Sequence, residues 1–213
     1  MMKISMINGS QKRGESNSGI ILKKFNDLIK GKHEVKFYDS GLKQFTNEIF
    51  EEIISGDVIV LAFPLFVYSV PSNTLRMLIE LETIIKQKQD KKLIIYTIMN
   101  NGFYEGKQNS TAFEIIKNWC ECSGVIFGGG IGQGAGEMLG QLKNLPLNKS
   151  PFANLGRTLK AMVEKMELKE PFEITYLNPY FPRFLWRIMA ARNWNTLANK
   201  NGLKKKDIKK KII

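Results

Sequence analysis

Polar residues that could hold a phosphate group follow the first apolar segment of the chain. The run Ile4–Ile7 ends in Asn8-Gly9-Ser10, and a polar loop continues to a helix pattern that begins near Ser16. Hydroxyls, backbone N–H groups and the positive end of a helix dipole together bind phosphate without a dedicated cationic pocket. The predicted phosphate-binding residues are Ser10, Lys12, Arg13, Ser16, Asn17 and Ser18, with Ser16 as the N-cap of the helix.

The spacing within this loop narrows the class of ligand. The loop has no Gly-Lys-Ser/Thr ending of the Walker type and no G-x-G-x-x-G pattern, so a nucleoside triphosphate or a dinucleotide lying across the helix is disfavoured. A monophosphate fits the loop better. The alternative interpretation is an ordinary polar loop with a capping serine.

A second loop, 64–71, is apolar and aromatic, although it follows a segment that reads as a buried strand. Such a loop is normally polar unless a flat group covers it, and Phe66 and Tyr68 could frame a planar ring. The alternative is that these side chains are buried against a partner subunit. The candidate ring-binding residues are Pro64, Leu65, Phe66, Val67 and Tyr68.

A third loop follows the fourth apolar segment and is rich in Asn and Gly. Such residues form tight turns and present backbone N–H and C=O groups to the edge of a ring, although a generic turn is the alternative. The candidates are Asn100, Asn101, Gly102, Phe103, Tyr104 and Glu105. A phosphate site, an aromatic wall and a polar edge together predict flavin mononucleotide (FMN) as the cofactor.

The elements that must position these loops alternate between strands and helices. Strands are predicted at 4–7, 35–38, 57–63, 93–99 and 125–127, and helices at 17–30, 47–55, 72–87, 108–122 and 152–166. This alternation predicts an α/β, doubly wound, five-stranded parallel sheet in a three-layer sandwich. Ligands bind there at the carboxyl ends of the strands, where the strand order reverses. The glycine-rich run 128–136 is expected to form a flexible connection.

Two of these segments resemble a known family. I-N-G-S-Q-K-R-G-E-S-N-S resembles the phosphate loop of the flavodoxin-like NADPH-dependent FMN reductases and multimeric-flavodoxin-type oxidoreductases, and D-V-I-V-L-A-F-P-L-F-V-Y-S-V-P resembles their second motif. Gln11 and Phe66 stand where the family has Pro and Tyr. The resemblance covers residues 1–165 and implies a flavodoxin-like fold of strand order 2-1-3-4-5 with FMN bound by the three loops.

The resemblance also implies an activity. NADH or NADPH would transfer a hydride to N5 of the flavin, and the electrons would pass to a small-molecule acceptor such as a quinone, a nitro or azo compound or free flavin. No catalytic side chain is then required. Two alternatives are an electron carrier that docks a redox protein, and a flavin-free scaffold that binds a partner or membrane. Carriers usually have an acidic surface, and 22 basic against 19 acidic residues precede Arg183.

The C-terminal part differs in charge from the rest. Ten of the 32 Lys and Arg residues lie from Arg183 onward, with one acidic residue, so we expect a flavodoxin-like domain at 1–167 and a basic helical extension at 168–213. A predicted helix at 179–198 carries Phe181, Phe184, Leu185, Ile188 and Met189 on one face, opposite Arg183 and Arg187. This pattern favours packing on the sheet edge or on a second subunit, with peripheral membrane contact through 179–213 as the alternative.

The remaining composition excludes several classes of protein. Cys120 and Cys122 are too few and too close for a disulfide framework or a metal site, and no apolar run is long enough to span a membrane. No leader segment is apparent, so we expect a cytoplasmic enzyme without a metal. The nearly neutral body and the lack of a binding motif argue against nucleic acid as a partner. We expect a homodimer.

Overall fold

The computed structural model describes the whole chain except residues 42–43, 89–91, 205 and 208–213. Its sheet has six parallel strands in the order β2-β1-β3-β4-β5-β6. The order of the first five strands confirms the predicted doubly wound sheet, and β6 adds a short edge strand. The strands are β1 (Lys3–Asn8), β2 (Glu34–Asp39), β3 (Val58–Pro64), β4 (Ile94–Asn100), β5 (Ile126–Gln133) and β6 (Thr175–Leu177).

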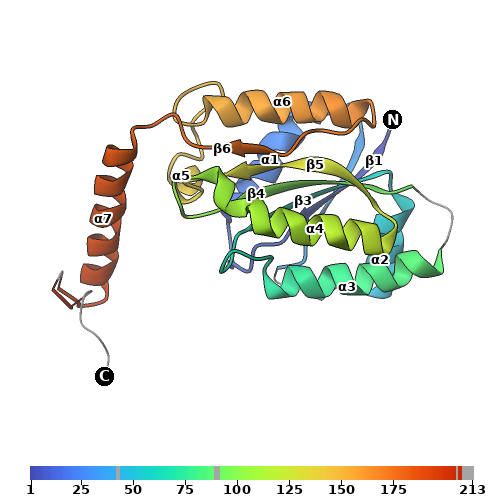
Figure 1. Cartoon of the computed structure of the whole chain (residues 1–213), viewed down its shortest axis with the longest axis horizontal. Helices are drawn as coiled ribbons and strands as arrows, with labels where there is room; N and C mark the ends of the chain where they lie inside the picture. The colour runs from blue at the N-terminus through green and yellow to red at the C-terminus, as the bar shows by residue number, and fades with distance from the viewer. Residues whose placement is uncertain (42–43, 89–91, 205, 208–213) are drawn as a thin grey trace. The chain divides into compact units, whose positions relative to one another are not determined.

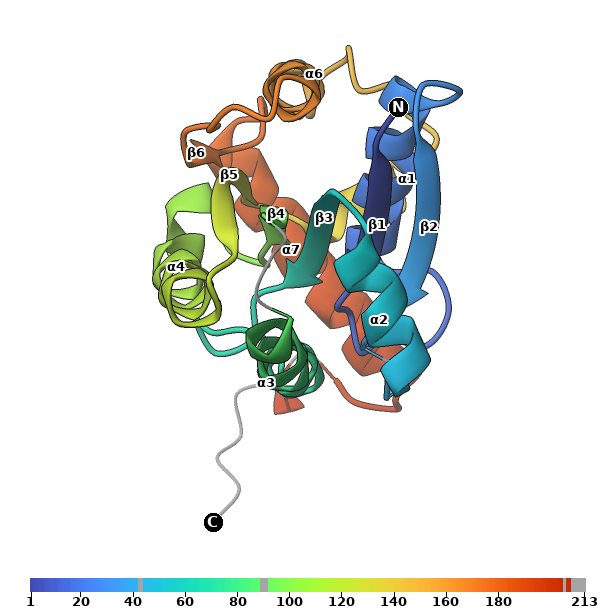
Figure 2. The ribbon, with the colours of Figure 1, turned by 90° about the vertical axis from the view of Figure 1, so that its right-hand side faces the viewer.

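Helices cover both faces of this sheet (Figures 1 and 2), which confirms the three-layer architecture. On one face, α2, α3 and α4 bury apolar side chains against β1, β3 and β4 in a continuous core. Helices α1 and α6 lie on the other face. The helices are α1 (Asn17–Ile29), α2 (Asn47–Ser55), α3 (Ser72–Gln87), η1 (Gly106–Asn109), α4 (Ser110–Ser123), α5 (Glu137–Gln141), α6 (Ala153–Glu167) and α7 (Arg183–Lys200).

The two central strands explain why the sheet is parallel and buried. Every residue of β4 is buried, and so is every residue of β3 except the last. Parallel strands covered on both faces are apolar throughout rather than alternating, as the sequence predicts for these segments. Because β1 lies between β2 and β3, the strand order reverses at β1, and the loops after β1 and β3 meet at this switch point.

The glycine-rich run is a strand, so the prediction of a flexible connection over 128–136 is wrong for most of its length. Strand β5 extends to Gln133, and residues 128–133 are buried. A side chain on Gly128 would lie 2.6 Å from Cζ of Tyr96, and one on Gly130 would lie 2.8 Å from Cζ of Phe113. The aromatic rings of neighbouring elements therefore occupy the space that side chains of β5 would fill.

The chain forms two compact units, Met1–Pro179 and Tyr180–Ile213. Residues 168–179 belong to the first unit, where β6 pairs with β5. The second unit contains α7, which begins at Arg183, four residues later than predicted. Much of the Lys-rich tail, at 205 and 208–213, lies outside the described residues. None of the described helices is both long and apolar enough to cross a bilayer.

Candidate functional site

The loop after β1 is fixed in place from both sides. The Gly9 N–H donates to the Ala62 carbonyl of β3 (2.8 Å), and the Thr74 hydroxyl of α3 donates to the Gly9 carbonyl (3.0 Å). A side chain at position 9 would meet Thr74 and lie 2.9 Å from Cβ of Phe63. Glycine is therefore required because α3 and β3 both approach the backbone closely.

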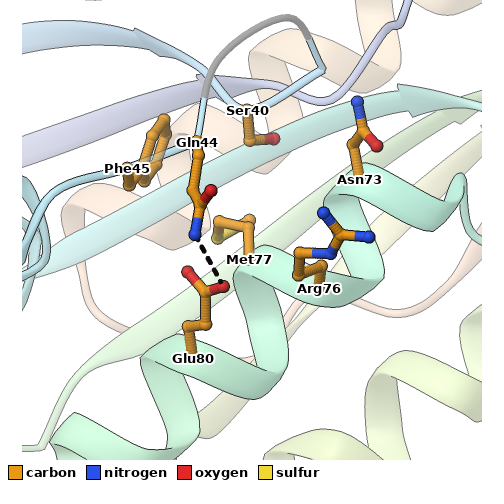
Figure 3. A pocket seen from close by; sticks show the side chains of 7 residues that line it. All are labelled: Ser40, Gln44, Phe45, Asn73, Arg76, Met77 and Glu80. Carbon is orange, nitrogen blue, oxygen red and sulfur yellow. Dashed lines mark hydrogen bonds between the residues drawn. The ribbon is translucent and has the colours of Figure 1, made fainter.

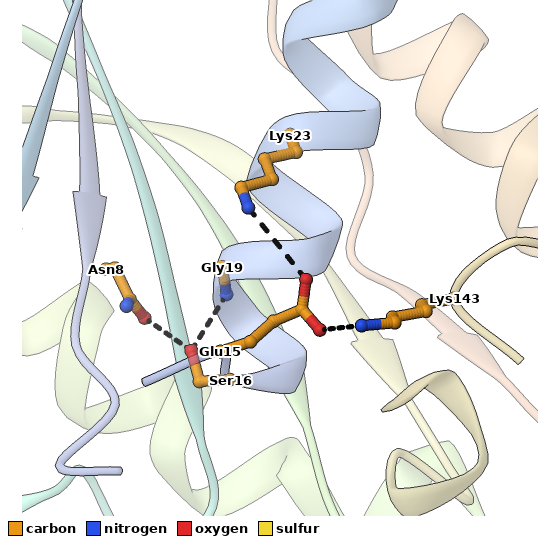
Figure 4. Close-up of polar contacts among 6 residues, drawn as sticks. All are labelled: Asn8, Glu15, Ser16, Gly19, Lys23 and Lys143. Carbon is orange, nitrogen blue, oxygen red and sulfur yellow. Dashed lines mark hydrogen bonds and ion pairs between the residues drawn. The ribbon is translucent and has the colours of Figure 1, made fainter. Parts of the chain in front are cut away.

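Asn8, the last residue of β1, organises the rest of this loop. Its Oδ1 accepts hydrogen bonds from the Ser10 N–H (3.2 Å) and from the Ser16 hydroxyl (3.3 Å), and the Ser16 Oγ accepts from the Gly19 N–H (3.1 Å). Figure 4 shows this chain of contacts from the strand end to the first turn of α1. Ser16 is the N-cap of α1, as predicted. The role of Asn8 was not predicted. The sequence feature that could have revealed it is a polar amide at the end of an apolar strand.

An ion pair closes the outer side of the same loop. Lys143 lies 2.7 Å from the Glu15 carboxylate, and Lys23 lies 3.9 Å from it (Figure 4). The hydrogen bond from Lys143 lowers the pKa of Glu15 below its ordinary value. Glu15 therefore stays ionised and paired, while the first turn of α1 contains no acidic residue. The positive end of the helix dipole is left available to an anion.

The loop after β3 is a tight hairpin turn with an uncommon backbone. Phe66 and Ser69 exchange two backbone hydrogen bonds of 3.0 and 2.8 Å, and the two residues between them, Val67 and Tyr68, have φ of +46° and +60°. Positive φ at both central positions defines a type I′ turn, which normally requires Asn or Gly. The Val67 side chain is 93% exposed. A β-branched residue in this conformation indicates strain that its own contacts do not relieve.

The loop after β4 connects the other two. The Asn100 side chain is buried and donates to the Ser18 hydroxyl (2.9 Å) and to the Phe63 carbonyl (3.3 Å). The Leu65 N–H donates to the Asn100 carbonyl (2.8 Å). Asn101 closes an Asx turn by accepting from the Phe103 N–H (2.8 Å). Asn100 therefore couples the start of α1 to the ends of β3 and β4.

Where these loops meet, they enclose a cavity of about 330 Å³, which we call the switch-point cavity. Its volume lies near the lower end of the range for small-molecule sites, roughly 300–1,000 Å³. Hydroxyl, amide and ammonium groups line one part, and a proline and an aromatic ring line another. The lining residues are Ser10, Gln11, Lys12, Ser16, Asn17, Ser18, Pro64, Phe66 and Asn100.

Gln11 was not among the predicted site residues, although the sequence marks it as a departure from the family pattern. Its amide donates to the Ser72 hydroxyl (3.1 Å), which connects the cavity wall to α3. Several predicted residues lie outside the lining. They are Arg13, Leu65, Val67, Tyr68, Asn101, Gly102, Phe103, Tyr104 and Glu105.

Some of these outer residues extend the apolar side of the site. The rings of Tyr68 and Phe103 stack with centroids 5.4 Å apart and planes inclined by 21°. Each ring is a little less than half exposed. The Tyr104 hydroxyl lies 3.4 Å from the Pro179 carbonyl, and the Gly106 N–H donates to Asn178 (2.9 Å). The third loop is therefore packed against the segment that follows β6.

The donor set of the switch-point cavity fits a phosphate ester. Ser18 accepts a bond from Asn100 and Ser10 accepts one from the Lys12 N–H (3.3 Å), so each hydroxyl retains its own proton to donate. The N–H groups of the first helical turn have no partner within the helix, and the Lys12 ammonium adds positive charge. Phe66 and Pro64 provide an apolar surface for a flat ring. The described residues contain no group of three or more His, Cys, Asp or Glu side chains arranged to bind a metal.

Comparison with known proteins shows which solved structures share this fold. No protein-family model matches the chain, and no curated protein matches it in sequence. Among solved structures, an NADH:FMN oxidoreductase in its apo form superposes over 80% of this chain and 90% of its own, with a TM-score of 0.57 and 9% identity. A flavone reductase matches over 81% of this chain and 66% of its own (TM-score 0.55, 15% identity).

A third solved structure, a protein from Streptococcus mutans, matches over 75% of this chain and 100% of its own, with a TM-score of 0.54 and 10% identity. Identities this low establish the fold and leave the activity open. The strand order and these likenesses together confirm, at the level of the fold, the resemblance that the two sequence motifs indicated. The chain has the flavodoxin-like fold, in the form that an NADH:FMN oxidoreductase and a flavone reductase also adopt.

Proposed function

We propose that this protein binds FMN in the switch-point cavity and acts as an NAD(P)H-dependent oxidoreductase on a small acceptor. One observation carries the proposal: the three loops enclose a cavity that combines hydroxyl donors and a helix N-terminus with an apolar wall. A phosphate ester attached to a flat heteroaromatic ring needs both parts. The solved structures of the same fold include an NADH:FMN oxidoreductase, which favours the same cofactor here.

The residues of the cavity have separate roles in this proposal. Ser10, Ser18 and Lys12 bind the phosphate, while Asn8 and Asn100 hold those groups in position through their hydrogen bonds. Phe66 and Pro64 cover the ring and exclude water from one side of it. The bound flavin would supply the hydride chemistry, so the protein's own task is to bind, orient and shield it.

The first test is retention of flavin. The full-length protein is mixed with FMN and desalted, and its visible absorption spectrum is recorded. We expect a bound flavin spectrum that is weakened in Ser10→Ala and Ser18→Ala and unchanged in Ser55→Ala. Ser55 makes a suitable control because its hydroxyl bonds the Glu52 carbonyl at the end of α2, which precedes β3 and so lies away from the cavity. A colourless wild-type protein would overturn the proposal and favour the flavin-free scaffold.

A second measurement separates an enzyme from an electron carrier. FMN-loaded protein is assayed for oxidation of NADH and NADPH, with and without a quinone. We expect turnover with at least one nicotinamide and a higher rate when the quinone is present. A protein that retains flavin but oxidises neither nicotinamide would be a carrier. The body of the chain, with nearly balanced charges, favours the enzyme.

We also propose that the second unit mediates contact with another copy of the chain. The predicted apolar face of α7 is present in its first half, where Phe184, Leu185 and Ile188 are exposed. However, Trp194 follows Arg187 by seven residues and lies on the basic side, where Leu197 joins it. A membrane surface can bury only one side of a helix, whereas neighbouring protein chains can bury both.

The mass in solution tests this contact. For a chain of 24.3 kDa, we expect light scattering to report a dimer. Ile188→Glu and Leu197→Glu should each shift the protein towards the monomer, while Asn199→Glu, a charge added at an exposed polar position of the same helix, should not. A monomeric wild-type protein that sediments with anionic vesicles would instead support the membrane alternative.

A further inference from the structure

A second, smaller pocket lies between the loop after β2 and the first half of α3. Its volume is about 80 Å³, and Figure 3 shows the side chains that surround it. We call it the Arg76 pocket. Its lining residues are Ser40, Gln44, Phe45, Asn73, Arg76, Met77 and Glu80.

One buried polar atom in this pocket has no hydrogen-bond partner in the part of the chain that the structure describes. Ser40 is 3% exposed, and its Oγ makes no hydrogen bond to any part of the chain that the structure describes. Figure 3 shows this oxygen on the side of the pocket where Asn73 and Arg76 lie. A buried hydroxyl without a hydrogen-bond partner is unfavourable. Its presence at a pocket wall therefore indicates a ligand group that accepts a hydrogen bond from it.

Among the described residues, the cationic side chain of the pocket has no counterion. Arg76 projects from α3, and no carboxylate among the described residues forms an ion pair with it. Glu80 lies one helical turn further on, where Gln44 donates to it at 3.5 Å. The pocket therefore has a guanidinium and a hydroxyl at one end, and a carboxylate at the other that keeps an anion on the Arg76 side.

The loop after β2, which lines the Arg76 pocket, is bonded to the end of β1 beside the switch-point cavity. The N–H groups of Ser40 and Gly41 both donate to the Asn8 carbonyl (3.0 and 3.3 Å), and Asn8 anchors the loop that lines the switch-point cavity. On the other side, Asn73 donates to the Gly41 carbonyl (2.9 Å). The Arg76 pocket therefore lies beside the loop that lines the switch-point cavity.

We propose that the Arg76 pocket binds a single phosphate group through the Arg76 guanidinium and the Ser40 hydroxyl. The guanidinium fork matches the geometry of phosphate oxygens, and a serine hydroxyl donates to them. The volume is far below the roughly 300 Å³ at which sites for whole ligands begin, so the pocket takes one group rather than a nucleotide. That group is either free phosphate or the 2′-phosphate that distinguishes NADPH from NADH; the second source rests on the proposed function.

The first arm of the test uses inorganic phosphate and the full chain. Thermal unfolding is followed in increasing phosphate, against sodium chloride at equal ionic strength, since a ligand that binds the folded state raises Tm. Because the loop at Ser10 would also bind phosphate, every variant is compared in the wild-type and in the Ser10→Ala background. We expect a phosphate-dependent rise in Tm that Arg76→Gln abolishes and Ser40→Ala reduces.

Lys86→Gln is the matched control, since it removes one positive charge from an exposed position of the same helix, away from the pocket. It should keep the full response to phosphate. An equal rise in Tm for Arg76→Gln and the wild-type protein would overturn the proposal, provided that circular dichroism shows both to be folded. The same conclusion would follow if Lys86→Gln lost the response as completely as Arg76→Gln.

The second arm identifies the source of the phosphate. If NADPH supplies it, Arg76→Gln should raise KM for NADPH by about tenfold or more, as expected for a lost bond to a charged group, and leave KM for NADH unchanged. Loss of phosphate binding without a change in the ratio of the two KM values would support a site for free phosphate. If the wild-type protein oxidises no nicotinamide, the proposed function fails, while the Tm measurement still decides whether the pocket binds phosphate.

Discussion

The two loops that border the switch-point cavity are built in opposite ways. In the loop after β1, side-chain hydrogen bonds from Asn8 and Ser16 fix the backbone, and Gly9 stands where a side chain would collide with α3. In the loop after β3, Val67 and Tyr68 adopt positive φ with no glycine to ease it. The residue types of the loop after β1 suit its backbone conformation, whereas those of the loop after β3 do not.

The two loops therefore differ in how their backbone is held before a ligand binds. The loop after β1 is already arranged, so binding a phosphate there needs little reorganisation. The loop after β3 stores strain of about 1–3 kcal/mol at each such residue, and the exposed Val67 side chain obtains no packing in return. We infer that the turn is retained for a contact outside the isolated chain, with the ring of a ligand or with a second subunit.

The largest loss of stability is expected when the close contact between the first loop and α3 is disturbed. Gly9→Ala would place a methyl group against Thr74 and 2.9 Å from Cβ of Phe63, so we expect the free energy of unfolding to fall by about 1–3 kcal/mol. Urea denaturation measures this change. Gly14→Ala is the control: position 14 has φ +80° and open space around it, so only backbone strain of roughly 1 kcal/mol should appear. Equal losses at the two positions would show that the contact with α3 is unimportant.

A smaller effect is expected when the cap of α1 is removed. Ser16→Ala deletes the acceptor for the Gly19 N–H and the donor to Asn8, and we expect the unfolding free energy to fall by about 1 kcal/mol. FMN affinity, followed by flavin fluorescence, should fall as well because the loop loses its arrangement. Ser16→Asp keeps an acceptor for the Gly19 N–H but adds a negative charge and cannot donate to Asn8, so it should weaken FMN binding more than Ser16→Ala does. If Ser16→Asp binds FMN as tightly as the wild-type protein, the phosphate does not lie at this helix end.

The opposite change is expected in the second loop. Val67→Asn places a residue that tolerates positive φ in the type I′ turn, and we expect the unfolding free energy to rise by about 0.5–1 kcal/mol. Val67→Thr is the control, since it adds polarity but stays β-branched, and it should give no gain. If the exposed Val67 side chain contacts the bound ring, Val67→Asn should also weaken FMN binding, measured on the same samples. A loss of stability would show that the turn is not strained.

The difference between the loops also explains what the sequence could predict. The apolar strands β3 and β4, the helices α2 and α3 and the cap at Ser16 all follow from local patterns, whereas the strand order follows from the family resemblance. The positive φ at Val67 has no local signal, because the usual Asn-Gly is missing. Such a turn arises from tertiary constraints that override local preference.

Contacts between distant segments account for the other errors. The run 128–133 contains four glycines and reads as a flexible connection, yet it forms a buried strand because Tyr96 and Phe113 fill the space beside it. Strand β6 has only three residues, so no periodic pattern could reveal it. Gln11 lines the cavity through its position in the folded loop, where its amide reaches Ser72 of α3. In each case the information lies in residues far away in the sequence.

The smallest effect concerns the outer support of the first loop. Because Lys143 lowers the pKa of Glu15 below its ordinary value of 4.5, this carboxylate stabilises the folded state above about pH 4.5 and ceases to do so as the pH falls through its lowered folded-state pKa. We expect Glu15→Gln to be slightly less stable than the wild-type protein at pH 7, and this gap to narrow as the pH falls below 4.5, as measured by urea denaturation. The gap at pH 7 should also shrink in 1 M salt, since the pair is exposed. A gap that does not narrow in acid would mean that Glu15 supports the loop through packing rather than through charge.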